Sequence, residues 1–142
     1  MSVYETLAAP VPLCLLLLVD TPAMPETNPE CLRHLGGTSY DVDCYVGLTK
    51  DIQKDSGRVY KQLQNSMPVG NKFRQLLDEY MATQTAAEKF CLLDKEAGTD
   101  WKPSPSTDSY NMWDAIYAGC IYNTRKLQNV RLHGLLKLHN EN

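Results

Sequence analysis

Four cysteines, Cys31, Cys44, Cys91 and Cys120, constrain the fold of this 142-residue chain more than any other feature. No two of them have the C-x-x-C spacing of zinc sites, and only His34 lies near a cysteine in the sequence. Structural cysteines are therefore favoured over a metal site or a catalytic thiol. An even number of such cysteines in a short chain indicates two disulfides, formed in an oxidising compartment.

The N-terminal residues 1–23 are predicted to be a signal peptide. Their apolar run, residues 12–19, is far shorter than the roughly 20 residues of a transmembrane helix, and small residues precede Met24 as a cleavage point. Cleavage would remove the fifth cysteine, Cys14, and leave residues 24–142 as a single helical domain. No Lys or Arg precedes the apolar run, so two alternatives stay open: a cytosolic protein that starts at Met24, or an ordinary packed helix.

Three segments of the chain have helical periodicity, because their apolar residues recur mostly at steps of three or four. They run from a cap at Asp41 or Asp43 to about Met67, then from Phe73 to Cys91, and then from a cap at Asp108 or Ser109 almost to the C-terminus. Residues 22–37 are rich in Pro and Gly and are predicted to form an irregular lead-in. We expect an all-α fold, a disulfide-stapled three-helix bundle.

The third predicted helix carries the longest apolar stripe, which we expect to be buried. Its members are Trp113, Ile116, Tyr117, Cys120, Thr124, Leu127, Val130, Leu135 and Leu138. Arg125 and Arg131 lie on or beside this stripe. We expect their stems to cover the core, with the guanidinium groups in water or paired to a carboxylate. Weak points are expected at Ser56-Gly57 in the first helix and at Gly134 in the third.

The order of the helices favours two disulfide pairs. Cys31 with Cys44 would tether the lead-in to the first helix and close a loop of about a dozen residues, worth ~3 kcal/mol. Cys91 with Cys120 would clamp the two ends of a Pro- and Ser-rich segment, Glu96 to Ser109, which we expect to be a surface loop. A rigid loop loses less entropy on binding a partner.

Trp101, flanked by Asp100 and Lys102, is the candidate binding residue of this loop. Tryptophan is a frequent anchor of protein interfaces. The alternative is that its side chain folds back and caps the bundle. These three residues are the predicted binding site.

Charge and motifs argue against several other functions. The formal net charge is −3 and the charged residues are interspersed, so no basic patch for nucleic acid is expected. There is no phosphate-binding loop, zinc-protease motif or serine-hydrolase motif, and Asp41-Val42-Asp43 lacks the Gly and Glu of a calcium loop. We expect no enzymatic activity, no cofactor, no metal and no membrane span.

Several residues give the chain a resemblance to a known family over about residues 31–135. They are the four-cysteine frame, Tyr60 sixteen residues after Cys44 with Leu63 following, and the run Tyr117-Ala118-Gly119-Cys120 that leads to Thr124-Arg125. In these features the chain resembles the LprI-type lysozyme-inhibitor family. The chain departs from the family pattern at Ser56-Gly57, Thr83 and Ala87.

The resemblance implies a small, exported, all-helical bacterial protein with the same two disulfide pairs, located in the periplasm or secreted. It implies a non-catalytic inhibitor that occludes a lysozyme or another peptidoglycan hydrolase. Two alternatives share the scaffold: an immunity protein against a secreted antibacterial effector, and a structural envelope or host-interacting module.

Overall fold

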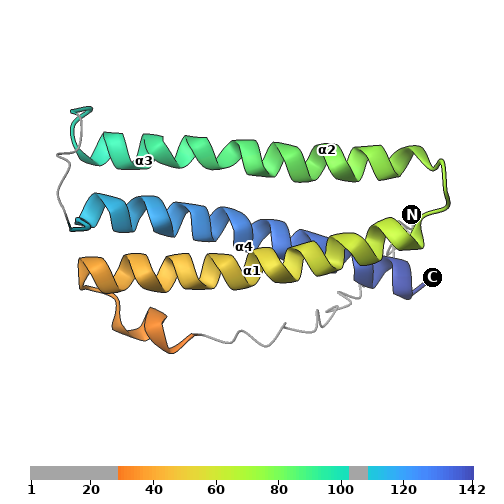
Figure 1. Cartoon of the computed structure of the whole chain (residues 1–142), viewed down its shortest axis with the longest axis horizontal. Coiled ribbons are helices and arrows are strands. Elements are labelled where there is room, and N and C mark those ends of the chain that lie inside the picture. The colour runs from red at the N-terminus through yellow and green to blue at the C-terminus, as the bar shows by residue number, and fades with distance from the viewer. Residues whose placement is uncertain (1–28, 103–108) are drawn as a thin grey trace, which may run out of the picture.

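The computed structural model describes residues 29–102 and 109–142, and every regular element in these ranges is helical. The elements are the 3-10 helix η1 (Glu30–His34), α1 (Thr38–Ser66), α2 (Lys72–Ala87), the 3-10 helix η2 (Glu88–Phe90), α3 (Cys91–Gly98) and α4 (Met112–Asn140). α2, η2 and α3 follow one another directly and form one rod, which lies beside α1 and α4 (Figure 1). The predicted all-α three-helix bundle is confirmed. The predicted signal peptide lies outside the described residues.

α1 begins earlier than predicted. Its N-cap is Gly37, and Asp41 lies in the first turn, where its carboxylate accepts hydrogen bonds from the Gly36 N–H at 3.0 and 3.2 Å. Asp43 lies further along the helix and is exposed. The backbone N–H groups at a helix start need acceptors, and a carboxylate in the first turn can reach back to supply one. The prediction that Asp41 or Asp43 is the N-cap was therefore wrong.

The rod is longer than predicted. Cys91, expected at the end of the second helix, is the first residue of α3, and the helix continues to Gly98. Residues 92–97 contain neither Pro nor Gly, so nothing in them interrupts the helix. The surface loop predicted to start at Glu96 therefore starts at Thr99.

α4 is capped by Asn111 and not by Ser109, while Asp108, the other predicted cap, lies outside the described residues. The Asn111 side chain accepts hydrogen bonds from the N–H groups of Trp113 at 2.9 Å and Asp114 at 3.1 Å. The Asp114 carboxylate in turn accepts the Asn111 N–H at 2.9 Å. This reciprocal capping box holds the first turn of α4 in place.

The hydrophobic core lies near the turn that joins α1 to α2. Its almost fully buried members come from all three rods: Val59, Leu63, Leu77 and Leu132. Partly buried tyrosine, methionine and leucine side chains pack around them. This end of the bundle is where apolar burial holds the three rods together.

Hydrogen bonds join α1 to α2 at the same end. The Tyr60 hydroxyl and the Gln64 amide both donate to the Asp78 carboxylate at 2.5 Å, and Arg74 donates to the Gln64 carbonyl at 2.6 Å. α1 and α3 contact each other little, whereas α4 packs along both α1 and α3. α1 and the rod therefore separate from each other towards the end that carries η1.

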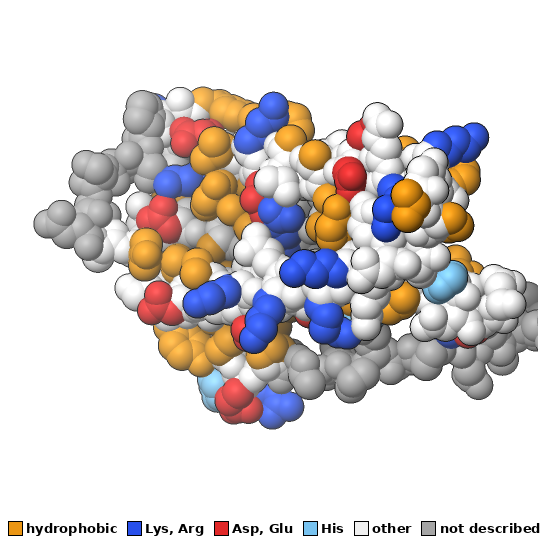
Figure 2. Space-filling model, turned by 45° about the vertical axis from the view of Figure 1, so that its right-hand side comes forward, with side chains coloured by type: hydrophobic (Ala, Val, Ile, Leu, Met, Phe, Trp, Pro, Cys, Tyr) orange, Lys and Arg blue, Asp and Glu red, His pale blue; other side chains and the backbone are white. Residues whose placement is uncertain are grey.

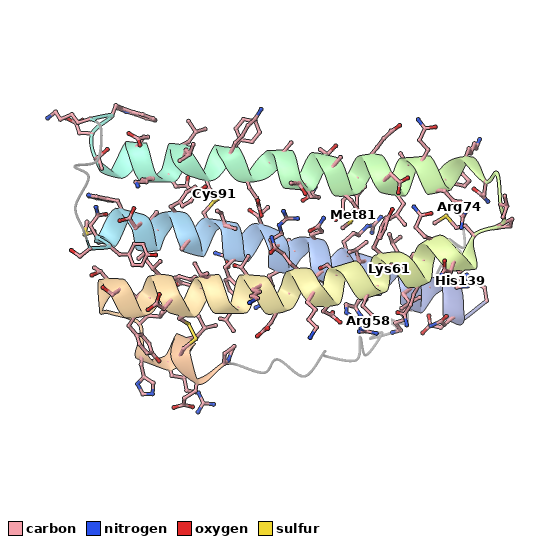
Figure 3. All side chains as sticks on the ribbon, viewed as in Figure 1. Arg58, Lys61, Arg74, Met81, Cys91 and His139 are labelled. Atoms are coloured by element: carbon pink, nitrogen blue, oxygen red, sulfur yellow. A yellow bond between two sulfur atoms is a disulfide. The ribbon has the colours of Figure 1, made fainter. Side chains whose placement is uncertain are left out.

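Both predicted disulfides are present. Cys31 in η1 is bonded to Cys44 in α1, and Cys91 in α3 is bonded to Cys120 in α4, with Cα atoms 5.8 and 5.6 Å apart. Figure 3 shows Cys91 on the side of the rod that faces α4. The first disulfide holds the lead-in against α1, and the second holds the rod against α4.

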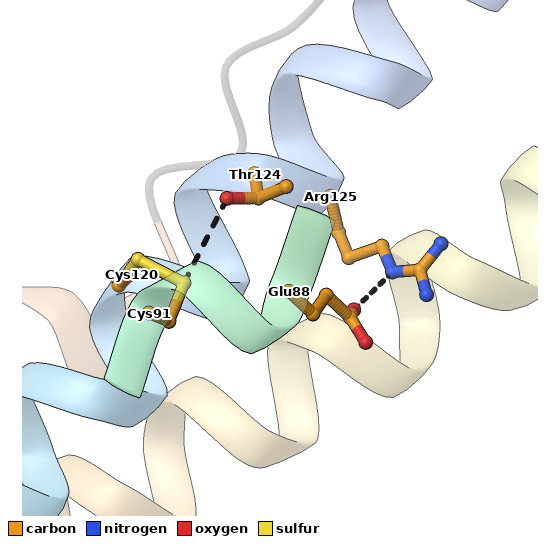
Figure 4. The surroundings of a disulfide bond; sticks show 5 residues. All are labelled: Glu88, Cys91, Cys120, Thr124 and Arg125. Carbon is orange, nitrogen blue, oxygen red and sulfur yellow. Dashed lines mark hydrogen bonds and ion pairs between the residues drawn. A yellow bond between two sulfur atoms is a disulfide. The ribbon is translucent and has the colours of Figure 1, made fainter. Parts of the chain in front are cut away.

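A buried ion pair lies beside the second disulfide. Arg125 of α4 is only 7% exposed, and its Nε donates to the Glu88 carboxylate (Figure 4). The same guanidinium donates to Gln128 at 3.0 Å and to the Thr85 hydroxyl at 3.3 Å. A buried charge is tolerated when its hydrogen bonds are satisfied in this way. Arg125 thus has a structural role, pairing with a carboxylate.

A second polar contact joins α1 to α4 near their middle. His133 Nε2 lies 2.6 Å from the Asp55 carboxylate, and the Asn129 amide donates to Asp55 at 2.8 Å and to the buried Ser56 hydroxyl at 3.0 Å. Burial raises the pKa of Asp55, but hydrogen bonds from Asn129, His133 and Arg58 outweigh it and hold this pKa well below its usual value. α1 is continuous from Thr38 to Ser66, so the weak point expected at Ser56-Gly57 does not interrupt the helix.

The stripe predicted to be buried on α4 is partly exposed. Four of its apolar side chains are between 41% and 71% exposed: Ile116, Leu127, Val130 and Leu138. A helix in a three-rod bundle contacts two neighbours, so the face that points away from both stays open. The predicted stripe is therefore not the buried face of α4, and its members are at most partly buried. The buried residues lie on a different face: Ala118, Gly119, Tyr122, Arg125, Gln128 and Leu132.

We expect removal of the second disulfide to destabilise the fold markedly. The double variant Cys91→Ala/Cys120→Ala frees two residues 29 positions apart, and the chain-entropy model gives a loss of about 3–4 kcal/mol in the free energy of unfolding. Urea unfolding followed by circular dichroism measures this loss, with the Cys31→Ala/Cys44→Ala variant as a matched disulfide deletion. An unchanged midpoint in the first variant would contradict the role given to this bond.

Stability should fall in acid partly through Asp55. Because its folded-state pKa lies below the ordinary 3.8, the unfolded chain takes up the proton first, and the stabilisation present above about pH 4 is lost as the pH falls. We expect Asp55→Asn to be less stable than the wild type near neutral pH and the difference to shrink towards about pH 2. Thermal unfolding across this range measures it, and a pH-independent difference would refute the assignment.

Candidate functional site

The turn after α3 closes the helix with a Schellman motif. The Asp100 N–H donates to the Ala97 carbonyl at 3.2 Å, and the Trp101 N–H donates to the Glu96 carbonyl at 2.8 Å. The motif places a left-handed residue directly after the helix end, usually a glycine. Asp100 occupies that position with φ 58°. The rod therefore ends in a turn held by its own backbone.

Trp101 is left-handed as well, with φ 59°. This conformation costs a residue other than glycine roughly 1–3 kcal/mol and persists only where its surroundings hold it. The Thr99 hydroxyl donates to the Lys102 carbonyl at 2.7 Å, and the Lys102 N–H donates to the Thr99 carbonyl at 3.2 Å. Hydrogen bonds on both sides of Trp101 thus define its position.

The indole of Trp101 is 66% exposed, so it does not cap the bundle. A different tryptophan, Trp113 of α4, covers the end of α3. A Cβ atom at Gly98 would lie 2.1 Å from the Trp113 ring, so glycine is the residue that leaves room for this packing. Trp113 thus packs at the end of α3, whereas Trp101 is exposed to solvent.

Asp100 and Lys102 flank the exposed indole. Their side chains are 85% and 79% exposed, and the ammonium lies 3.4 Å from the carboxylate. A surface pair of this kind adds little stability. The three residues predicted from the sequence as a binding site therefore lie together on one turn, with an exposed aromatic residue beside a paired carboxylate and ammonium.

One disulfide and one ion pair fix this turn to α4. The Cys91–Cys120 disulfide holds the start of α3, and Lys95 Nζ lies 2.7 Å from the Asp114 carboxylate near its end. The hydrogen bond from Lys95, together with the Asn111 N–H, holds the pKa of Asp114 below its usual value. Because both ends of α3 are attached to α4, the turn moves with the bundle.

The described residues offer little reactive chemistry. The four cysteines within them are all disulfide-bonded, and no group of three or more His, Cys, Asp or Glu in the described ranges is placed to hold a metal ion. In the same ranges no helix is both long and apolar enough to cross a bilayer. The turn itself can form non-covalent contacts through the Trp101 indole and the flanking charges.

Several residues that build the turn were missed in the sequence analysis. Gly98 and Thr99 were treated as parts of a loop, and Asn111 was not recognised as the cap of α4. The spacing of Asn111 and Asp114 is a capping-box signal that could have identified the true helix start. The contact of Gly98 with Trp113 has no such signal, because it joins residues on separate helices.

The variant Asp100→Gly should stabilise the protein. Glycine takes the left-handed conformation at this helix end without steric penalty, so we expect the free energy of unfolding to rise by about 0.5–1 kcal/mol. Urea unfolding of the oxidised protein measures the change. Asp100→Ala is the matched control, because it loses the same carboxylate but keeps a Cβ atom and should show no gain. Equal effects of the two variants would refute the strain assigned to Asp100.

Comparison with known proteins does not identify a family for this chain. The chain matches no protein-family model, no curated protein and no solved structure. The two disulfides are compatible with the LprI-type cysteine frame but do not identify that family. The resemblance therefore stays a prediction, and the function has to be argued from the turn after α3.

Proposed function

We propose that this protein is a non-catalytic binding protein that docks onto a protein partner through the turn at Trp101. The observation that carries the proposal is the 66% exposed indole on a turn with two left-handed residues. A fixed, exposed tryptophan can enter a partner's pocket without first losing conformational freedom, which increases affinity. The strain in the turn is understandable if the position of this side chain matters to function.

The location of the turn supports docking by insertion. Figure 1 shows it at the end of the rod opposite the α1–α2 turn, where it projects from the bundle. An exposed tryptophan at the end of a rod suits a concave surface on the partner, such as the substrate cleft of an enzyme. Occupation of that cleft would exclude the substrate.

For the partner we propose a lysozyme or another peptidoglycan hydrolase. This part of the proposal rests on the resemblance of the four-cysteine frame to the LprI-type inhibitors. The two disulfides support a protein that works in the periplasm or after secretion, where such hydrolases act and where disulfides persist. The N-terminal apolar stretch would serve as the export signal.

The test is inhibition and binding by the oxidised protein against a panel of animal and bacterial peptidoglycan hydrolases. We expect one of them to be inhibited stoichiometrically and Trp101→Ala to weaken its binding by at least tenfold, equivalent to about 1.4 kcal/mol or more. Cell-wall turbidity assays and calorimetry measure the two effects. Because Trp101 is exposed, the variant should unfold like the wild type.

Phe73→Ala is the matched control, since Phe73 is a 53% exposed aromatic residue at the start of α2, at the other end of the rod. It should leave inhibition unchanged. Binding that is insensitive to Trp101→Ala would overturn the docking surface. No binding to any hydrolase would overturn the proposed partner class and favour a cognate toxin or a structural role.

A further inference from the structure

A cavity of about 470 Å³ opens where α1 and α3 separate, with α4 forming its floor. This volume lies within the roughly 300–1,000 Å³ of small-molecule sites. Most of its apolar lining comes from α1 and α4: Val42, Val46, Tyr117, Ala118 and Ile121. It is a mainly apolar cavity that opens to solvent between α1, α3 and α4, and Trp101 does not line it.

One polar group in the lining lacks a partner. Thr49 is only 8% exposed, and its hydroxyl oxygen makes no hydrogen bond. Buried hydroxyl groups almost always have a partner, because desolvation without one is unfavourable. A ligand with a hydrogen-bonding oxygen at this point of the cavity would satisfy the group.

The charged residues around the cavity determine whether it favours an anionic or a cationic ligand. Asp114 is already occupied by Lys95 and by the Asn111 N–H, so neither member of that ion pair is free to bind strongly. Lys50 also lines the cavity and is exposed, and it forms no ion pair with any described residue. The uncompensated charge at the cavity is therefore positive.

Other basic residues follow Lys50 along α1, with Asp51 directly beside it in the sequence. The residues three and four positions away on α1 include no carboxylate: they are Val46, Gly47, Gln53 and Lys54. Lys54, Arg58 and Lys61 continue the basic row along α1, although Arg58 pairs with Asp55. Figure 2 shows Lys and Arg side chains across the middle of the molecule, where α1 runs, beside apolar side chains. Such a row attracts anions to the cavity mouth.

We propose that this cavity binds a small anionic amphiphile, a monocarboxylate with an apolar chain. The chain lies against Val42, Val46 and Ile121, and the carboxylate pairs with Lys50 and accepts the Thr49 hydroxyl. Apolar burial supplies most of the affinity, and the single charge pair orients the ligand. This activity goes beyond the proposed docking at Trp101 and does not depend on it.

The test uses sodium decanoate as the probe and the oxidised full-length protein, with binding measured by calorimetry. We expect saturable binding with a stoichiometry of one and no comparable binding of a decyl ammonium cation. Lys50→Gln should weaken binding by about tenfold. Lys54→Gln, which removes an equal charge from the same exposed row but does not line the cavity, should change it less than about twofold. Equal weakening in both variants would show only general attraction and would overturn the site.

Two further variants test the interior of the cavity. Thr49→Val keeps the shape of the side chain but removes the hydroxyl, and it should weaken decanoate binding several-fold while stabilising the free protein. Val46→Trp fills the cavity from a 56% exposed position, so it should abolish binding without disturbing the fold. The proposal is overturned if the wild type fails to bind decanoate, or if Val46→Trp binds it normally.

A last experiment tests whether the ligand is a free carboxylate or the surface of an anionic membrane. Vesicles of an anionic phospholipid should not sediment the protein, because the cavity admits a single chain and offers one unpaired cation. Sedimentation with vesicles together with no decanoate binding would overturn the proposal in favour of the basic row on α1 as a surface for anionic membranes.

Discussion

The buried contact between Arg125 and Glu88, beside the Cys91–Cys120 disulfide, holds the α2–α3 rod against α4. The rest of the bundle depends on it, because α1 and the rod pack together only near the α1–α2 turn. This attachment acts together with the packing of Trp113 of α4 against Gly98 at the end of α3. A disulfide and an ion pair thus hold the rod and α4 together, as a continuous hydrophobic core holds the elements of a larger domain.

The same attachment creates both candidate sites. By fixing α3 to α4 and not to α1, it leaves a solvent-open cavity between α1 and α3, lined by Lys50 and the unpartnered Thr49. It also gives the turn after α3 a rigid base. Trp113 packs against Gly98 at the end of α3, while Trp101 is exposed on a turn with two left-handed residues. Strain at an exposed aromatic residue is the kind of local conflict that is expected at functional positions.

Much of the fold could be predicted because it depends on local patterns. The spacing of apolar residues indicated three helical rods, and the order of the cysteines indicated both disulfide pairs. The helix starts were less predictable. Asp41 accepts a hydrogen bond from the Gly36 N–H from within the first turn of α1, and Asn111 is one of several nearby residues that could cap α4. Of the site, the sequence indicated Trp101 and its charged neighbours but left two orientations open. The cavity was not predicted, since its lining comes from three separate helices.

The sequence by itself determined the all-α class, the rods and the cysteine framework, because periodicity and loop closure act along the chain. Only the tertiary structure decided which faces are buried. The buried residues of α4, among them Ala118, Tyr122 and Leu132, lie on a different face from the predicted apolar stripe. The stripe residues Ile116, Leu127 and Val130 are exposed, because α1 and the rod pack against the other face. The exposure of Trp101 was also decided by the tertiary structure, in which Trp113 and not Trp101 packs against Gly98 at the end of α3.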